Sequence, residues 1–152
     1  MLTYLPIIPQ FPGGIEPEMR NIPLMLKKSP PTVLVVDDEA LIRWSLGEML
    51  GERGYVVTEA DNARAAVSAI QNAEQPFDVV LLDYRLPDSA DLRLLEKVRR
   101  LAPTSQVIMI TAHNSPELAE GAAALGAYRV ISKPFEVESL AALVNQARTD
   151  RH

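Results

Sequence analysis

The chain has 152 residues, of which 47% are apolar and 23% are charged, and this is the composition of a folded globular domain. Cysteine is absent, which excludes disulfides, thiolate metal sites and a cysteine nucleophile. The net charge of −5 argues against direct binding of nucleic acid by this chain. No apolar run approaches the roughly 18 residues of a membrane span, and the opening M-L-T-Y-L-P-I-I-P lacks the basic start of a signal peptide. We therefore expect a cytoplasmic protein that does not contact a membrane.

Proline divides the chain into two parts. Seven of the 12 prolines fall within residues 1–31. Proline fixes its own backbone and pushes the preceding residue toward extended geometry, so this part is predicted to be an extended, poorly ordered arm. It is either upstream sequence, since Met19 or Met25 could be the true start, or an arm that docks on a surface. Residues 32–152 are predicted to form the folded domain.

Five short apolar runs, rich in β-branched residues, predict five strands. Continuous apolar runs of this length are typical of parallel strands that are buried on both faces. The predicted strands are residues 33–36, 55–57, 77–82, 107–110 and 128–131.

A stretch with helical spacing follows each predicted strand. The first helix is expected to direct Leu41, Leu46 and Leu50 toward the sheet and to end at Gly54, and Ser115 is expected to cap the fourth helix. Five strand–helix repeats predict an α/β fold with a doubly wound, five-stranded parallel sheet. The predicted helices are residues 40–53, 63–71, 89–101, 116–125 and 136–148.

Polar residues follow four of the five predicted strands. Asp37 and Asp38 follow the first, Asp83 the third, Thr111 the fourth and Lys133 the fifth. Ligands of such sheets bind beyond the carboxyl ends of the strands. Carboxylates that meet raise one another's pKa unless a cation lies between them, and Mg²⁺ prefers a few carboxylates plus water. An ammonium and a hydroxyl are suitable partners for a phosphoryl group.

This set predicts a carboxylate nucleophile, Asp83, that receives a phosphoryl group while Asp37 and Asp38 hold Mg²⁺. Each residue alone also has a plain structural interpretation. The two adjacent acids could form a turn, and Asp83 or Thr111 could cap a helix. Their joint placement after four strands is much harder to obtain by accident.

Four segments resemble the receiver domain of two-component response regulators. They are V-V-D-D-E-A, V-V-L-L-D-Y-R-L-P-D, I-M-I-T-A and G-A-Y-R-V-I-S-K-P-F, and the resemblance extends from residue 32 to about residue 148. It implies a flavodoxin-like (βα)5 sandwich with strand order 2-1-3-4-5. It also implies a signalling domain rather than an enzyme, phosphorylated by a sensor histidine kinase or a phosphotransfer protein.

The resemblance implies how the acids divide their roles. Asp83 would be the phosphoacceptor. Asp38 would bind Mg²⁺ directly, Asp37 would bind it mainly through water, and the backbone carbonyl of Arg85 would complete the metal shell.

The resemblance also implies roles at the fourth and fifth strands. Thr111 would move toward the phosphoryl group, helped by the amide of Ala112. Lys133 would pair with a phosphoryl oxygen, and Pro134 would follow a cis peptide bond.

Three positions depart from the family pattern. Val130 replaces an aromatic residue three positions before the lysine, and Ala90 replaces a glycine, which puts the start of the third helix in question. His113 lies where the family varies, and we expect an exposed residue at the rim of the site rather than a base.

Within the family, I-R-W in the first helix and D-Y-R-L-P-D-S-x-D-L resemble the nitrogen-regulator group. This favours regulation of transcription through a downstream or partner output domain. The alternative is a stand-alone receiver that acts by protein contact or in a phosphorelay. The output or homodimer face is expected on the fourth helix, fifth strand and fifth helix, near Ala119, Ala123, Tyr128 and Arg129.

A Mg²⁺-dependent aspartyl phosphatase is the competing enzyme class. That class needs an acid two residues past its nucleophile at the end of the first strand. Here the acids after the first strand are adjacent, and Asp83 is followed two residues later by Arg85, so this class is disfavoured.

Overall fold

The computed structural model describes residues 29–150, in which strands and helices alternate along the chain. The strands are β1 (Thr32–Val36), β2 (Val56–Ala60), β3 (Val79–Asp83), β4 (Gln106–Thr111) and β5 (Arg129–Ser132). The helices are α2 (Ala40–Glu52), α3 (Ala63–Asn72), α4 (Arg93–Leu101), α5 (Pro116–Ala124) and α6 (Val137–Thr149). Residues 1–28 of the predicted arm lie outside the described residues, so the division at residue 31 remains a prediction.

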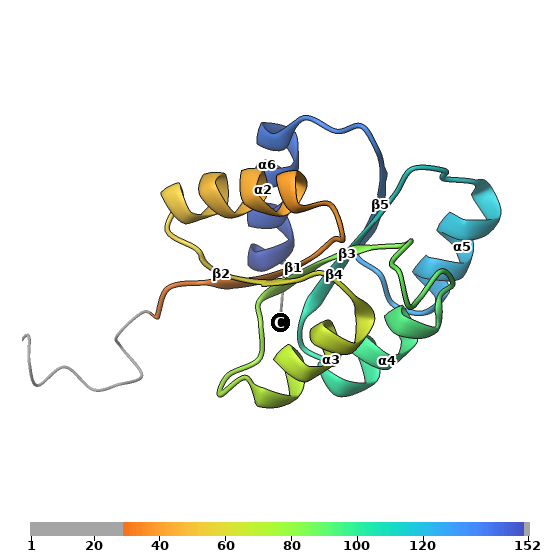
Figure 1. The fold of residues 1–152 in the computed structure, drawn as a ribbon, viewed down its shortest axis with the longest axis horizontal. Helices are drawn as coiled ribbons and strands as arrows, with labels where there is room; N and C mark the ends of the chain where they lie inside the picture. Colours follow the sequence, from red (N-terminus) through yellow and green to blue (C-terminus); the bar gives the residue numbers. More distant parts are fainter. Residues whose placement is uncertain (1–28, 151–152) are drawn as a thin grey trace, which may run out of the picture.

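All five strands pair in parallel, in the order β2-β1-β3-β4-β5. This confirms the doubly wound, flavodoxin-like sheet. Helices α2 and α6 cover one face, and α3, α4 and α5 cover the other (Figure 1). Because β1 and β3 are neighbours, with Val36 opposite Leu82, the residues that follow β1 lie beside the end of β3.

The central strands are apolar on both sides because both faces of the sheet are covered. In β1, Val33 and Val35 belong to the core under α2 and α6, while Leu34 and Val36 belong to the core under α3, α4 and α5. All four are at most 1% exposed. This burial holds the strands in place, so the backbone of the polar residues at their carboxyl ends is also fixed.

Several local predictions are confirmed. Gly54 adopts a positive φ of 93° directly after the C-cap of α2, a conformation that glycine adopts without strain. The Ser115 hydroxyl accepts a hydrogen bond from the Leu118 amide at the start of α5. The peptide bond between Lys133 and Pro134 is cis.

The predicted start of the third helix at residue 89 is wrong. Helix α4 begins at Arg93. Leu86 and Ser89 exchange two backbone hydrogen bonds, of 2.7 and 3.2 Å, which close a turn. The Asp91 carboxylate then accepts the Arg93 amide at 2.9 Å, so the helix can begin only after these bonds.

Leu41 was also expected to face the sheet, and this is wrong. Its side chain is 74% exposed, whereas Leu46 and Leu50 are buried. Leu41 precedes Leu46 by five residues, which places it about 140° around the helix at 3.6 residues per turn. The strand limits differ from the predicted ones by at most three residues, and Asp83 is the last residue of β3.

Candidate functional site

The predicted site residues gather at the carboxyl edge of the sheet. A cleft of about 730 Å³ is lined by residues that include Asp38, Asp83, Thr111 and Lys133. Asp37 lies beside it and is only 2% exposed. Strands β1, β3, β4 and β5 therefore bring together residues that span almost 100 positions of the chain.

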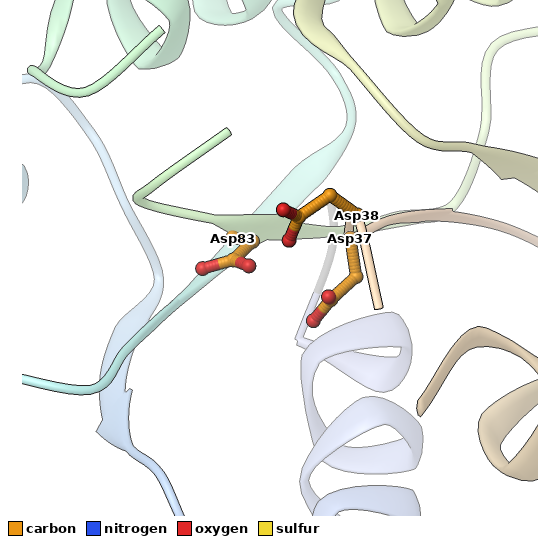
Figure 2. A group of neighbouring side chains, drawn as sticks. All are labelled: Asp37, Asp38 and Asp83. Atoms are coloured by element: carbon orange, nitrogen blue, oxygen red, sulfur yellow. The ribbon is translucent and has the colours of Figure 1, made fainter. Parts of the chain in front are cut away.

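Three carboxylates form a group that could hold a metal ion. Single oxygens of Asp37, Asp38 and Asp83 all lie within 4.8 Å of one another (Figure 2). Asp37 Oδ1 accepts the Glu39 amide at 2.8 Å, and the buried Oδ2 lies 3.1 Å from the Lys133 ammonium. Three carboxylates beside one ammonium carry an excess of negative charge, and this fits a hard divalent cation such as Mg²⁺.

Lys133 supplies the opposite charge. Its Nζ lies 3.1 Å from Oδ2 of Asp37, 3.1 Å from Oδ2 of Asp83 and 2.9 Å from Oε1 of Glu39. Burial lowers the pKa of the Lys133 ammonium, but its bonds to Glu39 and Asp37 and the charge of Asp83 outweigh this, so the pKa is raised. Lys133 is therefore a permanent cation facing the acids.

The pKa of Asp83 is raised to about 6, first by burial and second by the charge of Asp37. The charge and hydrogen bond of Lys133 oppose this rise, as does the Arg85 amide, which donates to Oδ1 at 3.3 Å. Asp83 is thus mostly ionised at neutral pH, yet it is more basic than an ordinary aspartate.

The remaining predicted residues line the same cleft. Thr111 is 3% exposed, and its Oγ1 accepts the His113 amide at 3.1 Å. Ala112 and Arg85 also line the cleft, and His113 is exposed at its rim, as expected.

A family profile, the response regulator receiver domain, matches residues 33–145. The chain belongs to this family of receiver domains. The receiver is 38% identical over 117 residues to the DNA-binding transcriptional regulator NtrC of Proteus hauseri, a match that covers 77% of this chain and 24% of that protein. The chain thus spans about a quarter of the length of the curated relatives it matches first.

Solved receivers share the fold. A CheY-like receiver domain protein from Methanospirillum hungatei superimposes with a TM-score of 0.75 at 31% identity, covering 80% of this chain and 96% of that one. The beryllofluoride-activated NtrC4 receiver domain dimer gives a TM-score of 0.72 at 36% identity, covering 78% and 97%. Residues 29–150 of the receiver contain no helix that is both long and apolar enough to span a membrane.

Sequence reasoning missed two polar contacts next to the receiver's site. Asp88 accepts the amides of Ala63 and Arg64 at 2.7 and 3.1 Å and so ties the β3–α4 loop to the start of α3. Arg43 donates to the backbone carbonyl of Asp37 at 2.7 Å. Asp88 is separated from its partners by about 25 residues, so no local pattern points to its contact. The I-R-W motif draws attention to Arg43, but it does not indicate which group the guanidinium binds.

Proposed function

We propose that this receiver accepts a phosphoryl group on Asp83, with Mg²⁺ held by Asp37, Asp38, Asp83 and the carbonyl of Arg85. The observation that carries the proposal is the position of the Asp83 carboxylate. It lines the cleft, lies 3.1 Å from the Lys133 ammonium and belongs to the group of three carboxylates. The donor is the phosphohistidine of a sensor histidine kinase or of a phosphotransfer protein.

In the transfer, an Asp83 oxygen forms a bond to phosphorus while the phosphorus–nitrogen bond of the donor breaks. The electron pair of that bond stays with the imidazole nitrogen. The raised pKa of about 6 makes the Asp83 carboxylate a better nucleophile than an ordinary aspartate while leaving it ionised at neutral pH. Bound Mg²⁺ supplies positive charge to the phosphoryl oxygens and to the acids.

Two residues then stabilise the acyl phosphate. The Lys133 ammonium already donates a hydrogen bond to Asp83. It has three N–H groups and can donate one of them to a phosphoryl oxygen. The Thr111 hydroxyl accepts from the His113 amide and can still donate its own proton to a second oxygen, and the neighbouring Ala112 amide supports it.

We further propose that phosphorylation acts through the face made by α5, β5 and α6. There the Arg129 guanidinium lies 4.7 Å from the centroid of the Tyr128 ring, and the Tyr128 hydroxyl bonds Asp150 near the end of α6. Two relatives support this output: NtrC is a DNA-binding transcriptional regulator, and the activated NtrC4 receiver is a dimer. The partner is then an output domain or a second receiver, and a stand-alone or phosphorelay receiver would use the same Asp83 chemistry.

The decisive experiment is phosphorylation with acetyl phosphate and Mg²⁺, read by intact mass. The wild type should gain the mass of one phosphoryl group, and Asp83→Asn should gain none. Asp91→Asn is the matched control because Asp91 is paired with Arg93 outside the metal group, and it should react normally. Undiminished labelling of Asp83→Asn would overturn the assignment.

A further inference from the structure

Arg43, in the first turns of α2, joins three segments of the receiver. Its Nη1 donates to the backbone carbonyl of Asp37 at 2.7 Å, and its Nε donates to Oε1 of Glu59 on β2 at 3.2 Å. The Arg43 side chain is only 18% exposed and its bond to the Asp37 carbonyl is partly buried, whereas Glu59 is 46% exposed and its bond to Arg43 is open to water. The guanidinium therefore holds the carbonyl after β1 with one edge and β2 with another.

The surroundings of Glu59 keep this arrangement in place. Glu59 lies opposite Val35 in the β1–β2 pair, so its backbone is fixed by the sheet. Gly47 lies one turn after Arg43 on α2, and a Cβ there would come within 3.3 Å of Glu59 Oε2. Glycine at this position gives the carboxylate room to lie against the helix and to meet Arg43.

The contact acts on the peptide that joins Asp37 and Asp38. The Asp37 amide donates to the Ala60 carbonyl at 3.1 Å, and the Asp37 carbonyl accepts Arg43, so the backbone is held on both sides of Asp37. Among residues 29–150, the carboxylate of Asp38 is exposed and accepts no hydrogen bond. Only its backbone therefore directs Asp38 toward Asp83 (Figure 2).

We propose that Arg43 is a positioning residue of the metal site. By fixing the Asp37–Asp38 peptide, its guanidinium orients both carboxylates toward the cation, and this inference rests on the proposed function. The charge of Arg43 acts in the opposite direction, since a guanidinium close to the site repels Mg²⁺. Positioning and charge thus predict opposite effects when Arg43 is replaced.

The test is calorimetric titration of the full chain with Mg²⁺. Arg43→Lys keeps the charge but loses the fork that reaches both acceptors, and it should bind Mg²⁺ about tenfold more weakly. Arg43→Gln removes the charge as well and should still bind more weakly, whereas a purely electrostatic role predicts tighter binding. Arg93→Lys is the matched control, because Arg93 pairs with Asp91 outside the metal group, and its affinity should not change.

A second readout needs no metal. The backbone amide resonance of Asp38 in metal-free protein should shift in Arg43→Lys and stay in place in Arg93→Lys, while thermal melting verifies that each variant is folded. Each Arg43 variant that is folded tests whether Arg43 positions the metal site. Wild-type Mg²⁺ affinity in Arg43→Lys would overturn this inference alone, whereas a wild type that binds no Mg²⁺ would overturn the proposed metal site and this inference with it.

Discussion

The Lys133 ammonium lies 3.1 Å from Oδ2 of Asp83 and 3.1 Å from Oδ2 of Asp37. One cation on the loop after β5 thus lies against two buried acids, which stand directly after β1 and at the end of β3, and it offsets part of their charge. Without a metal, this ammonium is the charge that allows the acids to share one site. Under the proposed function, a phosphoryl group transferred to Asp83 would meet a cation already in place.

Replacing Lys133 should expose how much the acids depend on it. Lys133→Met keeps the aliphatic stem but leaves two buried carboxylates without their cation, so the free energy of unfolding at pH 8 should fall by about 3–5 kcal/mol. Urea denaturation in EDTA measures the loss, and saturating Mg²⁺ should recover part of it. Lys97→Met, an exposed change on α4, should have little effect. Equal losses in the two variants would contradict the prediction.

Stability should fall as the pH rises through about 6. The pKa of Asp83 is raised in the folded protein to about 6 from an ordinary value of 3.8, so folding favours the protonated acid. Its stabilising contribution is complete below the unfolded pKa and is lost as the pH passes the folded pKa. Between pH 4 and pH 8 the free energy of unfolding should therefore drop by about 2 kcal/mol on account of Asp83.

Asp83→Asn isolates this contribution. Histidines also titrate in this pH range, but both histidines of the chain remain in the variant, so the difference between the two proteins reports Asp83. The variant should be more stable than the wild type at pH 8, and the advantage should shrink toward pH 4. Denaturant unfolding across this range in EDTA provides the measurement. Parallel pH profiles for the two proteins would show that Asp83 has an ordinary pKa.

Asp88 should stabilise the loop that carries Arg85. Its carboxylate accepts two amides at the start of α3, and the hydrogen bond from Ala63 is the first cause of its lowered pKa. Asp88→Ala should cost about 1 kcal/mol, as loss of an N-cap does, and should speed amide exchange at Ala63 and Arg64. Asp91→Ala, at the start of α4, tests whether the exchange effect is local, because it should leave those two amides unchanged.

Signal transmission should depend on Thr111 more than on Val130. Val130 lies opposite Met109, and Ser132 lies opposite Thr111, so Val130 and Thr111 lie on the same face of the sheet. Valine is small and stiff at χ1, so it cannot swing between buried and exposed positions as an aromatic ring can. With beryllofluoride and Mg²⁺, Thr111→Ala should lose most chemical-shift changes across residues 112–125, while Val130→Ala should keep them. Wild-type shifts confined to the metal loops would refute this route.

The alternation of strands and helices can be predicted from the residues alone, because continuous apolar runs and helical spacing are local patterns. The same local patterns predict which side chains stand at the strand ends, and the structure places all five at that edge: Asp37, Asp38, Asp83, Thr111 and Lys133. The strand order came from the family resemblance, because the length and polarity of these strands would be the same in another order.

Which of these groups are in contact depends on packing between segments that are distant in the sequence. Lys133 bonds Glu39 across 94 residues of sequence, and Asp88 reaches Ala63 across 25. In the sequence, Arg43 looks like an ordinary helix residue. In the folded domain its guanidinium contacts Glu59 on β2 and the carbonyl directly after β1. Local spacing fixes where a side chain leaves the backbone, but its partner depends on the order and twist of the strands and on how the helices pack on them.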